Sequence, residues 1–295
     1  MVVASGSLNR PRRPVSASGL TDGPMQLDAS DYRKASDLPA GAILVIGSAQ
    51  SGCQIAEDLI LAGRETYLAT SHIGRLPRRY RGHDIVVWMV KTGLVDAPRR
   101  DFVDPSGRVA ARPMLGALHT ISLQSLSAQG VVLLGRFAGV ENGRLIFADD
   151  LAENIRLGDE VSAQFKNRID EFIKRGGLDV PAPVADEAEA IAPRLPRRPI
   201  LSLDLIDRNI SAIVWCTGFD GDFSWIDVQG VLDERGQPVH EDGVVSVPGL
   251  YFAGLDFAST RRSGTVMAVE DEARRFVGRI LARTDRPTVY TNRHI

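Results

Sequence analysis

The sequence has very little cysteine and no long hydrophobic run. Only two cysteines, Cys53 and Cys216, occur in 295 residues, and they form no CxxC motif. We therefore expect no redox-active dithiol, and a reducing cytosol is the natural compartment. No apolar run reaches the roughly 18 residues that span a bilayer, and the first residues lack the apolar core of a secretory signal. These absences predict a cytoplasmic protein with no membrane span.

The sequence also lacks an excess of either charge. It carries 35 lysines and arginines against 37 aspartates and glutamates, a net charge of −2, so we expect no nucleic-acid partner and no attraction to a membrane surface. The histidines His119, His240 and His294 have no metal-ligand spacing, and we expect no metal site. The length leaves room for two domains with sizeable cores. A homo-oligomer is left open.

One stretch organises the rest of the chain. A continuous apolar run at Ala42–Ile46 is followed by a glycine turn and by a helical pattern with Ile55, Leu59 and Ile60 on one face. A second short apolar strand then covers Thr66–Thr70. Strand, turn, helix and strand together predict a βαβ unit that holds a dinucleotide pyrophosphate at the helix N-terminus. The turn consists of Gly47, Ser48, Ala49, Gln50, Ser51 and Gly52.

The residue types in the turn fit this chemistry, with one departure. Phosphate oxygens must approach backbone N–H groups closely, so small residues are required. Gly47 suits the tight turn and Gly52 suits close packing of the helix on the strand, but Ala49 occupies the middle position, where glycine is usual. The alternative is an ordinary turn between a strand and a helix in an α/β sheet.

The end of the second strand indicates which dinucleotide is bound. Sites for NAD or FAD usually offer a carboxylate there for a ribose hydroxyl, and no acid follows Thr70. Hydroxyl and guanidinium groups follow instead, and these bind a 2′-phosphate well. The sequence thus favours NADP(H) over NAD(H), with a solvated basic loop as the alternative. The residues concerned are Ser71, Arg75, Arg78 and Arg79, with Arg81 next to them.

The remaining pattern predicts further elements of an α/β fold. Residues 83–92 are expected to be helical, and Val131–Leu134 is expected to pair with Leu145–Phe147 in a hairpin around Asn142-Gly143. A helix with an apolar stripe from Val161 to Ile173 should stop at Gly176-Gly177. Residues 178–199, rich in proline, alanine and acid, read as a linker or an extended strap.

Strands and a helix are also expected near both ends of the sequence. Residues 1–6 read as a buried strand that enters a glycine turn, and Ala212–Cys216 reads as another buried strand. Residues 245–253 form a further strand-like run. A last helix is expected from about Gly264 to Ala282, with Val266, Val269 and Phe276 toward the sheet.

With these elements in place, the chain resembles the flavin-containing monooxygenase superfamily, in particular bacterial flavoproteins often named for potassium transport. In that family a Rossmann-like NADPH-binding domain is inserted into an FAD-binding domain. The resemblance implies a remnant of the FAD domain and a connection at 1–38, the NAD(P)H domain at 39–199 and the second part of the FAD domain at 200–295. The turn Gly47–Gly52 then resembles the NADPH site.

The resemblance also assigns residues to the flavin side. Trp215–Phe219, with Thr217 and Gly218, is similar to the turn on return from the NADPH domain, and Pro248–Asp256 is similar to the strand that leads back to the flavin. Asp256 is read equally well as a flavin contact or as a cap of the following turn. Arg261–Gly264, with Arg262 and Ser263, would open the last helix beside the flavin ring, where a helix N-terminus stabilises negative charge.

Two departures from the family pattern bear on activity. The family's FAD-binding glycine motif is not found in these 295 residues, which puts FAD binding in doubt, and Asp28 stands where the family usually has a histidine. The sequence therefore predicts an NADPH- and FAD-dependent oxidoreductase acting with O₂ on a small molecule, or a shortened member of that family. The first alternative is a non-catalytic NADP(H)-binding protein. A weaker one makes Gly47–Gly52 the FAD site of a smaller enzyme, which the missing acid near Ser71 disfavours.

Overall fold

The computed structural model describes residues 1–20, 23–104 and 109–284, and it divides into two units. We call residues 11–92 and 111–218 the sheet unit, and residues 1–10, 93–110 and 219–295 the terminal unit. These units do not coincide with boundaries at 38/39 and 199/200, because strands on both sides of those boundaries belong to one sheet.

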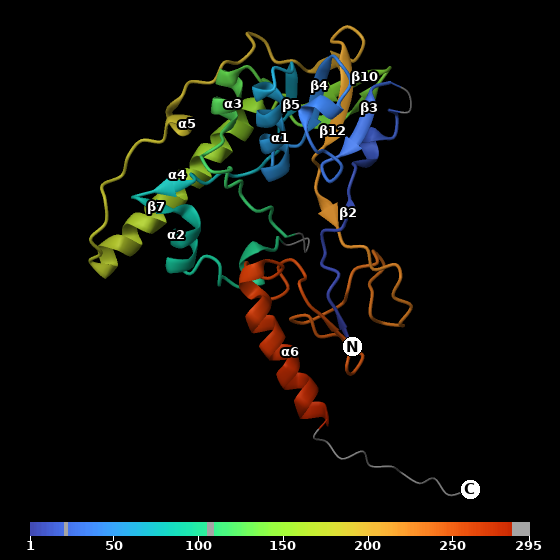
Figure 1. The fold of residues 1–295 in the computed structure, drawn as a ribbon, viewed down its shortest axis with the longest axis vertical. Coiled ribbons are helices and arrows are strands. Elements are labelled where there is room, and N and C mark those ends of the chain that lie inside the picture. Colours follow the sequence, from blue (N-terminus) through green and yellow to red (C-terminus); the bar gives the residue numbers. More distant parts are fainter. Residues whose placement is uncertain (21–22, 105–108, 285–295) are drawn as a thin grey trace, which may run out of the picture. The chain divides into compact units, whose positions relative to one another are not determined.

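The sheet unit is built on a five-stranded parallel sheet with strand order β3-β12-β4-β5-β8 (Figure 1). The predicted βαβ unit is confirmed at its centre, where α1 connects β4 to β5. Such a parallel sheet must be covered on both faces, and its central strand is buried at all five positions. The strands are β3 (Met25–Asp28), β4 (Ala42–Ile46), β5 (Thr66–Ala69), β8 (Val132–Leu134) and β12 (Ile210–Trp215).

Alternate residues of β4 serve two different cores. Ile43 and Val45 pack with Cys53 and Leu59 of α1 (Gln50–Leu61) and with α3 (Leu123–Gln129). Ala42, Leu44 and Ile46 pack on the opposite face with residues of a three-stranded antiparallel sheet. That second sheet consists of β9 (Phe137–Glu141), β10 (Arg144–Phe147) and β11 (Ser202–Asp204).

The predicted hairpin turn is correct, but its partner strand is wrong. Asn142 and Gly143 adopt positive φ angles of 49° and 75° and join β9 to β10. Val132–Leu134 instead pairs in parallel with β5. A two-residue turn joins the strands that flank it directly, and the more buried run of β8 belongs to the central sheet.

The long helix α4 (Leu151–Gly176) ends as predicted, at Gly177 with a φ of 57°. Its buried side includes Phe165 and Ile169 but also three polar or small residues, Asn154, Gly158 and Ser162. The strap, residues 178–199, carries the short helix α5 (Glu187–Ala190) and runs from the end of α4 back toward the sheet (Figure 1).

A basic hairpin lies between β5 and the next helix of the sheet unit. It is formed by β6 (Arg79–Tyr80) and β7 (His83–Asp84), followed by α2 (Ile85–Lys91). The helix predicted at 83–92 therefore begins two residues later, because the carboxylate of Asp84 accepts a hydrogen bond from the Val86 N–H and caps α2. The two-residue strand β2 (Arg10–Pro11) lies at the boundary of the units.

In the terminal unit, the predicted first strand is present as β1 (Val2–Val3), paired in parallel with β14 (Tyr251–Phe252). Only β14 of the predicted run 245–253 is strand. The remaining elements are β13 (Phe219–Asp220) and α6 (Val269–Thr284). In the described parts of the chain, no helix is long and apolar enough to cross a membrane.

The start of the last helix was predicted wrongly. α6 begins at Val269, preceded by a 3-10 turn at Val266–Ala268, because Gly264 adopts a φ of 79° and Thr265 is extended. Val266 and Val269 are 89% and 61% exposed, whereas Phe276 is buried as expected. Arg261–Gly264 thus forms a turn rather than a helix N-terminus.

Candidate functional site

The glycine turn after β4 is closed so tightly that two positions exclude any side chain. Gly47 has a φ of 107°, and a β-carbon there would lie 2.3 Å from the carbonyl oxygen of Cys216. A β-carbon on Gly52 would lie 1.7 Å from the carbonyl oxygen of Gly47. Glycine is thus required at 47 by the tight turn and at 52 by the close packing of the helix, as the sequence predicted.

The helix that follows the turn presents an uncapped N-terminus. Ala49 is the N-cap of α1, in an extended conformation, and makes no side-chain hydrogen bond to the helix. No acidic side chain stands in the first turn. Backbone N–H groups of a first helical turn lack partners within the helix and carry partial positive charge. The first turn of α1, which includes the exposed Ser51, is therefore suited to an anion such as a pyrophosphate.

Ser48 and Ser71 connect the glycine turn to the end of β5. The Ser71 N–H donates to Ser48 Oγ at 2.8 Å, and the Ser48 N–H donates to Ser71 Oγ at 3.3 Å. The structure thus brings together two predicted site residues that are 23 positions apart. Because Ser48 is buried, this pair fixes where the segment after β5 leaves the sheet.

Gln50 holds a loop that the sequence did not associate with the site. Its Oε1 accepts a hydrogen bond from the Leu115 N–H at 3.0 Å, and its Nε2 donates to the Gly116 carbonyl. Gln54 Nε2 donates to the same carbonyl at 3.3 Å. The amide of Gln50 is therefore used to dock residues 115–116 against the first turn of α1.

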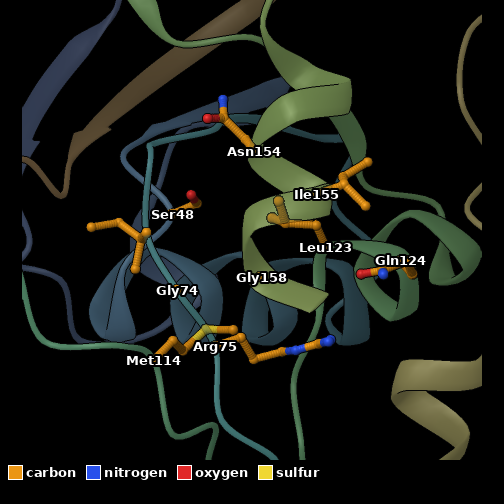
Figure 2. Close-up of a pocket in the computed structure, with 10 residues that line it drawn as sticks. Ser48, Gly74, Arg75, Met114, Leu123, Gln124, Asn154, Ile155 and Gly158 are labelled. Carbon is orange, nitrogen blue, oxygen red and sulfur yellow. The ribbon is translucent and has the colours of Figure 1, made fainter. Parts of the chain in front are cut away.

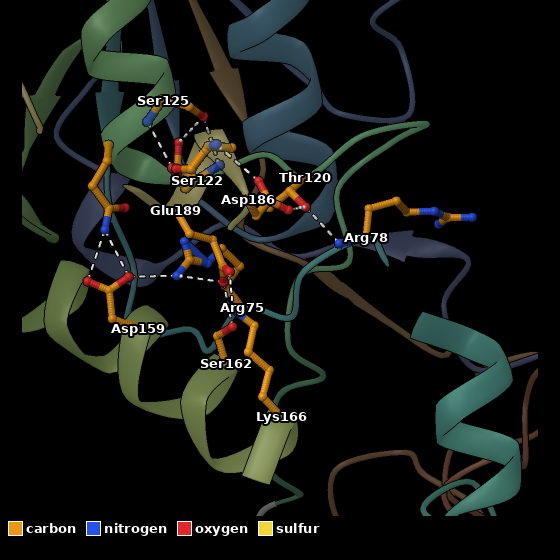
Figure 3. A network of polar contacts seen from close by, with 12 residues as sticks. Arg75, Arg78, Thr120, Ser122, Ser125, Asp159, Ser162, Lys166, Asp186 and Glu189 are labelled. Atoms are coloured by element: carbon orange, nitrogen blue, oxygen red, sulfur yellow. Dashed lines mark hydrogen bonds and ion pairs between the residues drawn. The ribbon is translucent and has the colours of Figure 1, made fainter. Parts of the chain in front are cut away.

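The predicted arginines have separate partners, and Figure 3 shows two of them, Arg75 and Arg78. Arg75 is buried, and its Nη2 lies 2.6 Å from Asp159 Oδ1 and 3.3 Å from Glu189 Oε1. Arg78 pairs with Asp84 at 2.7 Å. These carboxylates partly cancel the positive charge that the sequence suggested.

Arg79 and Arg81 lie in and just after strand β6. Arg79 is exposed and donates to the Gly82 carbonyl at 3.1 Å, whereas Arg81 pairs with Asp170 at 2.6 Å. Among these arginines, Arg79 is the one for which the structure shows a backbone oxygen rather than a carboxylate as its partner. Its positive charge is therefore the least compensated of the four and the most available to an added anion.

A small pocket of about 20 Å³ lies beside the glycine turn (Figure 2). It is about large enough for one water molecule. Two buried atoms of its lining residues, Asn154 Oδ1 and Arg75 Nε, have no hydrogen-bond partner among the described residues. The lining includes Ser48, Gly74, Arg75, Met114, Gln124 and Asn154. Asn154 and Gly158 of α4 were missed from the sequence because they precede the apolar stripe by which the helix was predicted.

Thr217 and Gly218 follow β12 directly. The Cys216 N–H donates to the Ile46 carbonyl at 2.8 Å, so this strand end lies against the glycine turn. Thr217 Oγ1 donates to the Arg12 carbonyl, and the Arg12 N–H donates to the Gly218 carbonyl at 3.0 Å. Both predicted residues are thus joined to the chain that precedes β3.

The two cysteines are buried in the same core cluster beside the turn. Burial, aided by the charge of Asp28, raises the pKa of Cys216 to about 12. Burial also raises the pKa of Cys53, with a smaller effect of Cys216 and Glu57. Both thiols are therefore protonated at neutral pH. Asp28 itself is held by Arg13 Nε at 2.8 Å.

The predicted flavin-side residues of the terminal unit lie close together. A β-carbon on Gly264 would lie 2.7 Å from the Cα of Asp256, whose N–H donates to Ser7 Oγ at 2.8 Å. Arg262 pairs with Asp96 and Asp271 at 2.8 and 3.1 Å. The Ser263 hydroxyl accepts hydrogen bonds from the N–H groups of residues 259 and 260.

The histidines His119 and His240 have hydrogen-bond partners within the chain. The described residues contain no group of three histidine, cysteine, aspartate or glutamate side chains arranged to hold a metal ion. His119 Nε2 lies 2.9 Å from Glu57 Oε1, and the Nδ1 of His240 accepts from the Gly243 N–H. His294 lies outside the described residues.

Comparison with known proteins agrees with this architecture. No family model matches the chain. An uncharacterized oxidoreductase named CzcO-like from Geobacillus kaustophilus is 29% identical over 282 residues, which cover 95% of this chain and 64% of that protein. The uncharacterized oxidoreductase CzcO of Bacillus subtilis is 25% identical over 274 residues, 92% of this chain and 62% of that protein. The chain therefore spans less than two thirds of these relatives.

A solved structure shares the fold. The flavin-containing monooxygenase from Stenotrophomonas maltophilia superposes with a TM-score of 0.54 at 17% identity, over 96% of this chain and 62% of that one. The chain thus shares the fold of a flavin-containing monooxygenase and is similar in sequence to proteins named as oxidoreductases.

Proposed function

We propose that this chain is a member of the flavin-containing monooxygenase superfamily and an NADPH- and FAD-dependent oxidoreductase, and that NADPH binds at the turn Gly47–Gly52. The observation that carries the proposal is the close approach of Gly47 and Gly52 to neighbouring carbonyls, in front of an uncapped helix N-terminus. This arrangement allows pyrophosphate oxygens to reach backbone N–H groups.

The proposal assigns the 2′-phosphate to the segment after β5. Ser71 is fixed beside the turn by Ser48. The exposed Arg79 donates to a backbone carbonyl, so no carboxylate that the structure describes neutralises its guanidinium charge. Arg78 contributes in part, because Asp84 already shares its charge. We leave Arg75 out of the direct phosphate site, since two carboxylates hold its guanidinium.

The flavin side of the proposal rests on Asp256 and Gly264, which both belong to the terminal unit. Thr217 and Gly218 remain candidate cofactor contacts of the sheet unit by itself. Within the terminal unit, the close contact of Gly264 with Asp256 leaves no room for a side chain at 264. Arg262 and Ser263 contribute less, because their polar groups are paired within the chain. When bound, NADPH would supply the hydride, and FAD would supply the redox chemistry that links this hydride and O₂ to oxidation of a small-molecule substrate.

Two measurements on the purified chain test this function. An absorption spectrum before and after addition of FAD tests flavin binding, and titration with NADPH and NADH tests the nucleotide site. We expect a flavin spectrum, tighter binding of NADPH than of NADH, and NADPH-dependent consumption of O₂. A chain that binds neither nucleotide would refute the assignment of the turn.

The second candidate is a non-catalytic NADP(H)-binding protein. It is favoured by the described part of the terminal unit, where β1 and β14 form a two-stranded sheet and no second glycine turn leads into a helix. Nucleotide binding without flavin binding would support this candidate over the enzyme.

A further inference from the structure

A cluster of four charged side chains ties the strap to the segment that follows β5 (Figure 3). Arg75 contacts Asp159 of α4 and Glu189 of α5, and Lys166 of α4 also contacts Glu189. Two positive and two negative charges therefore balance. Burial opposes ionisation of Glu189, but hydrogen bonds from Lys166 and Ser162 and the charge of Arg75 lower its pKa overall.

Arg75 also belongs to the wall of the pocket beside the glycine turn. It lines this pocket together with Ser48, and it lies four residues beyond Ser71 in the chain. Its Nε is buried and has no hydrogen-bond partner among the described residues. The guanidinium thus stands close to the proposed nucleotide site with one donor unused and its charge compensated by carboxylates.

We propose that Glu189 is a positioning residue that compensates the charge of Arg75 and so limits how strongly the site prefers NADP(H) over NAD(H). A guanidinium paired with two carboxylates adds little net potential at a third anion. Removing one carboxylate leaves a net positive charge behind the glycine turn, and a 2′-phosphate gains more from that charge than a 2′-hydroxyl does. This inference rests on the proposed nucleotide site.

The test compares binding of NADP⁺ and NAD⁺, which differ only in the 2′-phosphate. In the full chain at low ionic strength, Glu189→Gln should raise the affinity ratio of NADP⁺ to NAD⁺ about fivefold, the effect of one uncovered charge. Glu187→Gln is the matched control, because Glu187 lies on the same short helix but is exposed. It should leave the ratio unchanged.

A second variant keeps the test decisive if Glu189→Gln folds poorly. Asp159→Asn removes the other carboxylate of Arg75 and should shift the ratio in the same direction. Adding Arg75→Gln to either variant should cancel the shift. A purely structural role of Glu189 would change both affinities equally, and such a result, or a shift that survives Arg75→Gln, would overturn the inference. Failure of the wild-type chain to bind either nucleotide would instead refute the proposed function.

Discussion

Ser48 and Ser71 exchange hydrogen bonds between hydroxyl and backbone, at 2.8 and 3.3 Å, and so join the glycine turn to the end of β5. Each serine satisfies the N–H of the other, in a place where water has little access. The relative position of the proposed pyrophosphate site and of the proposed 2′-phosphate site therefore depends on this pair.

Replacing Ser48 by alanine should weaken both stability and nucleotide binding. The Ser71 N–H would lose its acceptor, and an unsatisfied polar group costs about 1–3 kcal/mol. Urea denaturation and NADPH titration measure the two effects. Ser51→Ala is the matched control on the exposed side of the same turn and should change the free energy of unfolding by less than about 0.5 kcal/mol. Equal losses of unfolding free energy in the two variants would contradict the role of the pair.

Replacing Gly52 by alanine should prevent the close packing of α1. Its β-carbon would lie 1.7 Å from a backbone carbonyl oxygen, so the helix must move. We expect a loss of about 2 kcal/mol or more in unfolding free energy, together with loss of nucleotide binding. Gly278→Ala, also within a helix, is the control. No atom lies within 4 Å of a β-carbon there, and the change should stabilise α6 by roughly 0.5–1 kcal/mol.

Replacing Arg79 by alanine should weaken NADPH binding about tenfold and NADH binding little, because a charged hydrogen bond to phosphate is worth about 1.5–3 kcal/mol. Arg78→Ala should act in the same direction but less, since Asp84 shares its charge. Arg156→Ala provides a control, because that arginine pairs with Glu160 on the exposed part of α4. Equal weakening of both nucleotides would rule out recognition of the 2′-phosphate by these arginines.

Stability should fall as the pH rises above about 8.5, the ordinary thiol pKa. Burial raises the pKa of Cys216 to about 12 and also raises that of Cys53, so the folded chain keeps protons that the unfolded chain loses. Each thiol should then cost up to about 1.4 kcal/mol per pH unit in this range. Denaturation midpoints between pH 7 and 10 measure the slope. Cys53→Ala should reduce this slope. An unchanged slope would mean that groups other than Cys53 cause the loss of stability.

Local chemistry in the sequence was sufficient to predict the centre of the fold. The apolar run Ala42–Ile46, the contact of Gly52 with the Gly47 carbonyl and the helix stop at Gly177 all depend on residues that are close together in the sequence. The hairpin shows where this reasoning stops. Asn142-Gly143 predicted the position of the turn correctly, but the pairing of Val132–Leu134 with β5 could be seen only in the structure.

The surroundings of the site depend on contacts between distant parts of the chain. Arg75 is neutralised by Asp159 and Glu189, which are 84 and 114 positions away. The charge run after β5 suggested a phosphate site in each arginine, because sequence alone gives no partner for any of them. Residues 115–116 dock on Gln50, which is also far away in the sequence, and no pattern in the sequence predicts this contact.

The central strand has a further consequence for insertions and deletions. Its five side chains are apolar on both faces, so a shift of β4 by one residue would still bury only apolar groups. Hydrophobicity alone does not define its alignment with its neighbours. The contact between Gly47 and the Cys216 carbonyl does, because a shift would bring a residue with a β-carbon to that point. Gly47, which closes the turn before α1, thus also fixes the alignment of β4 with β12.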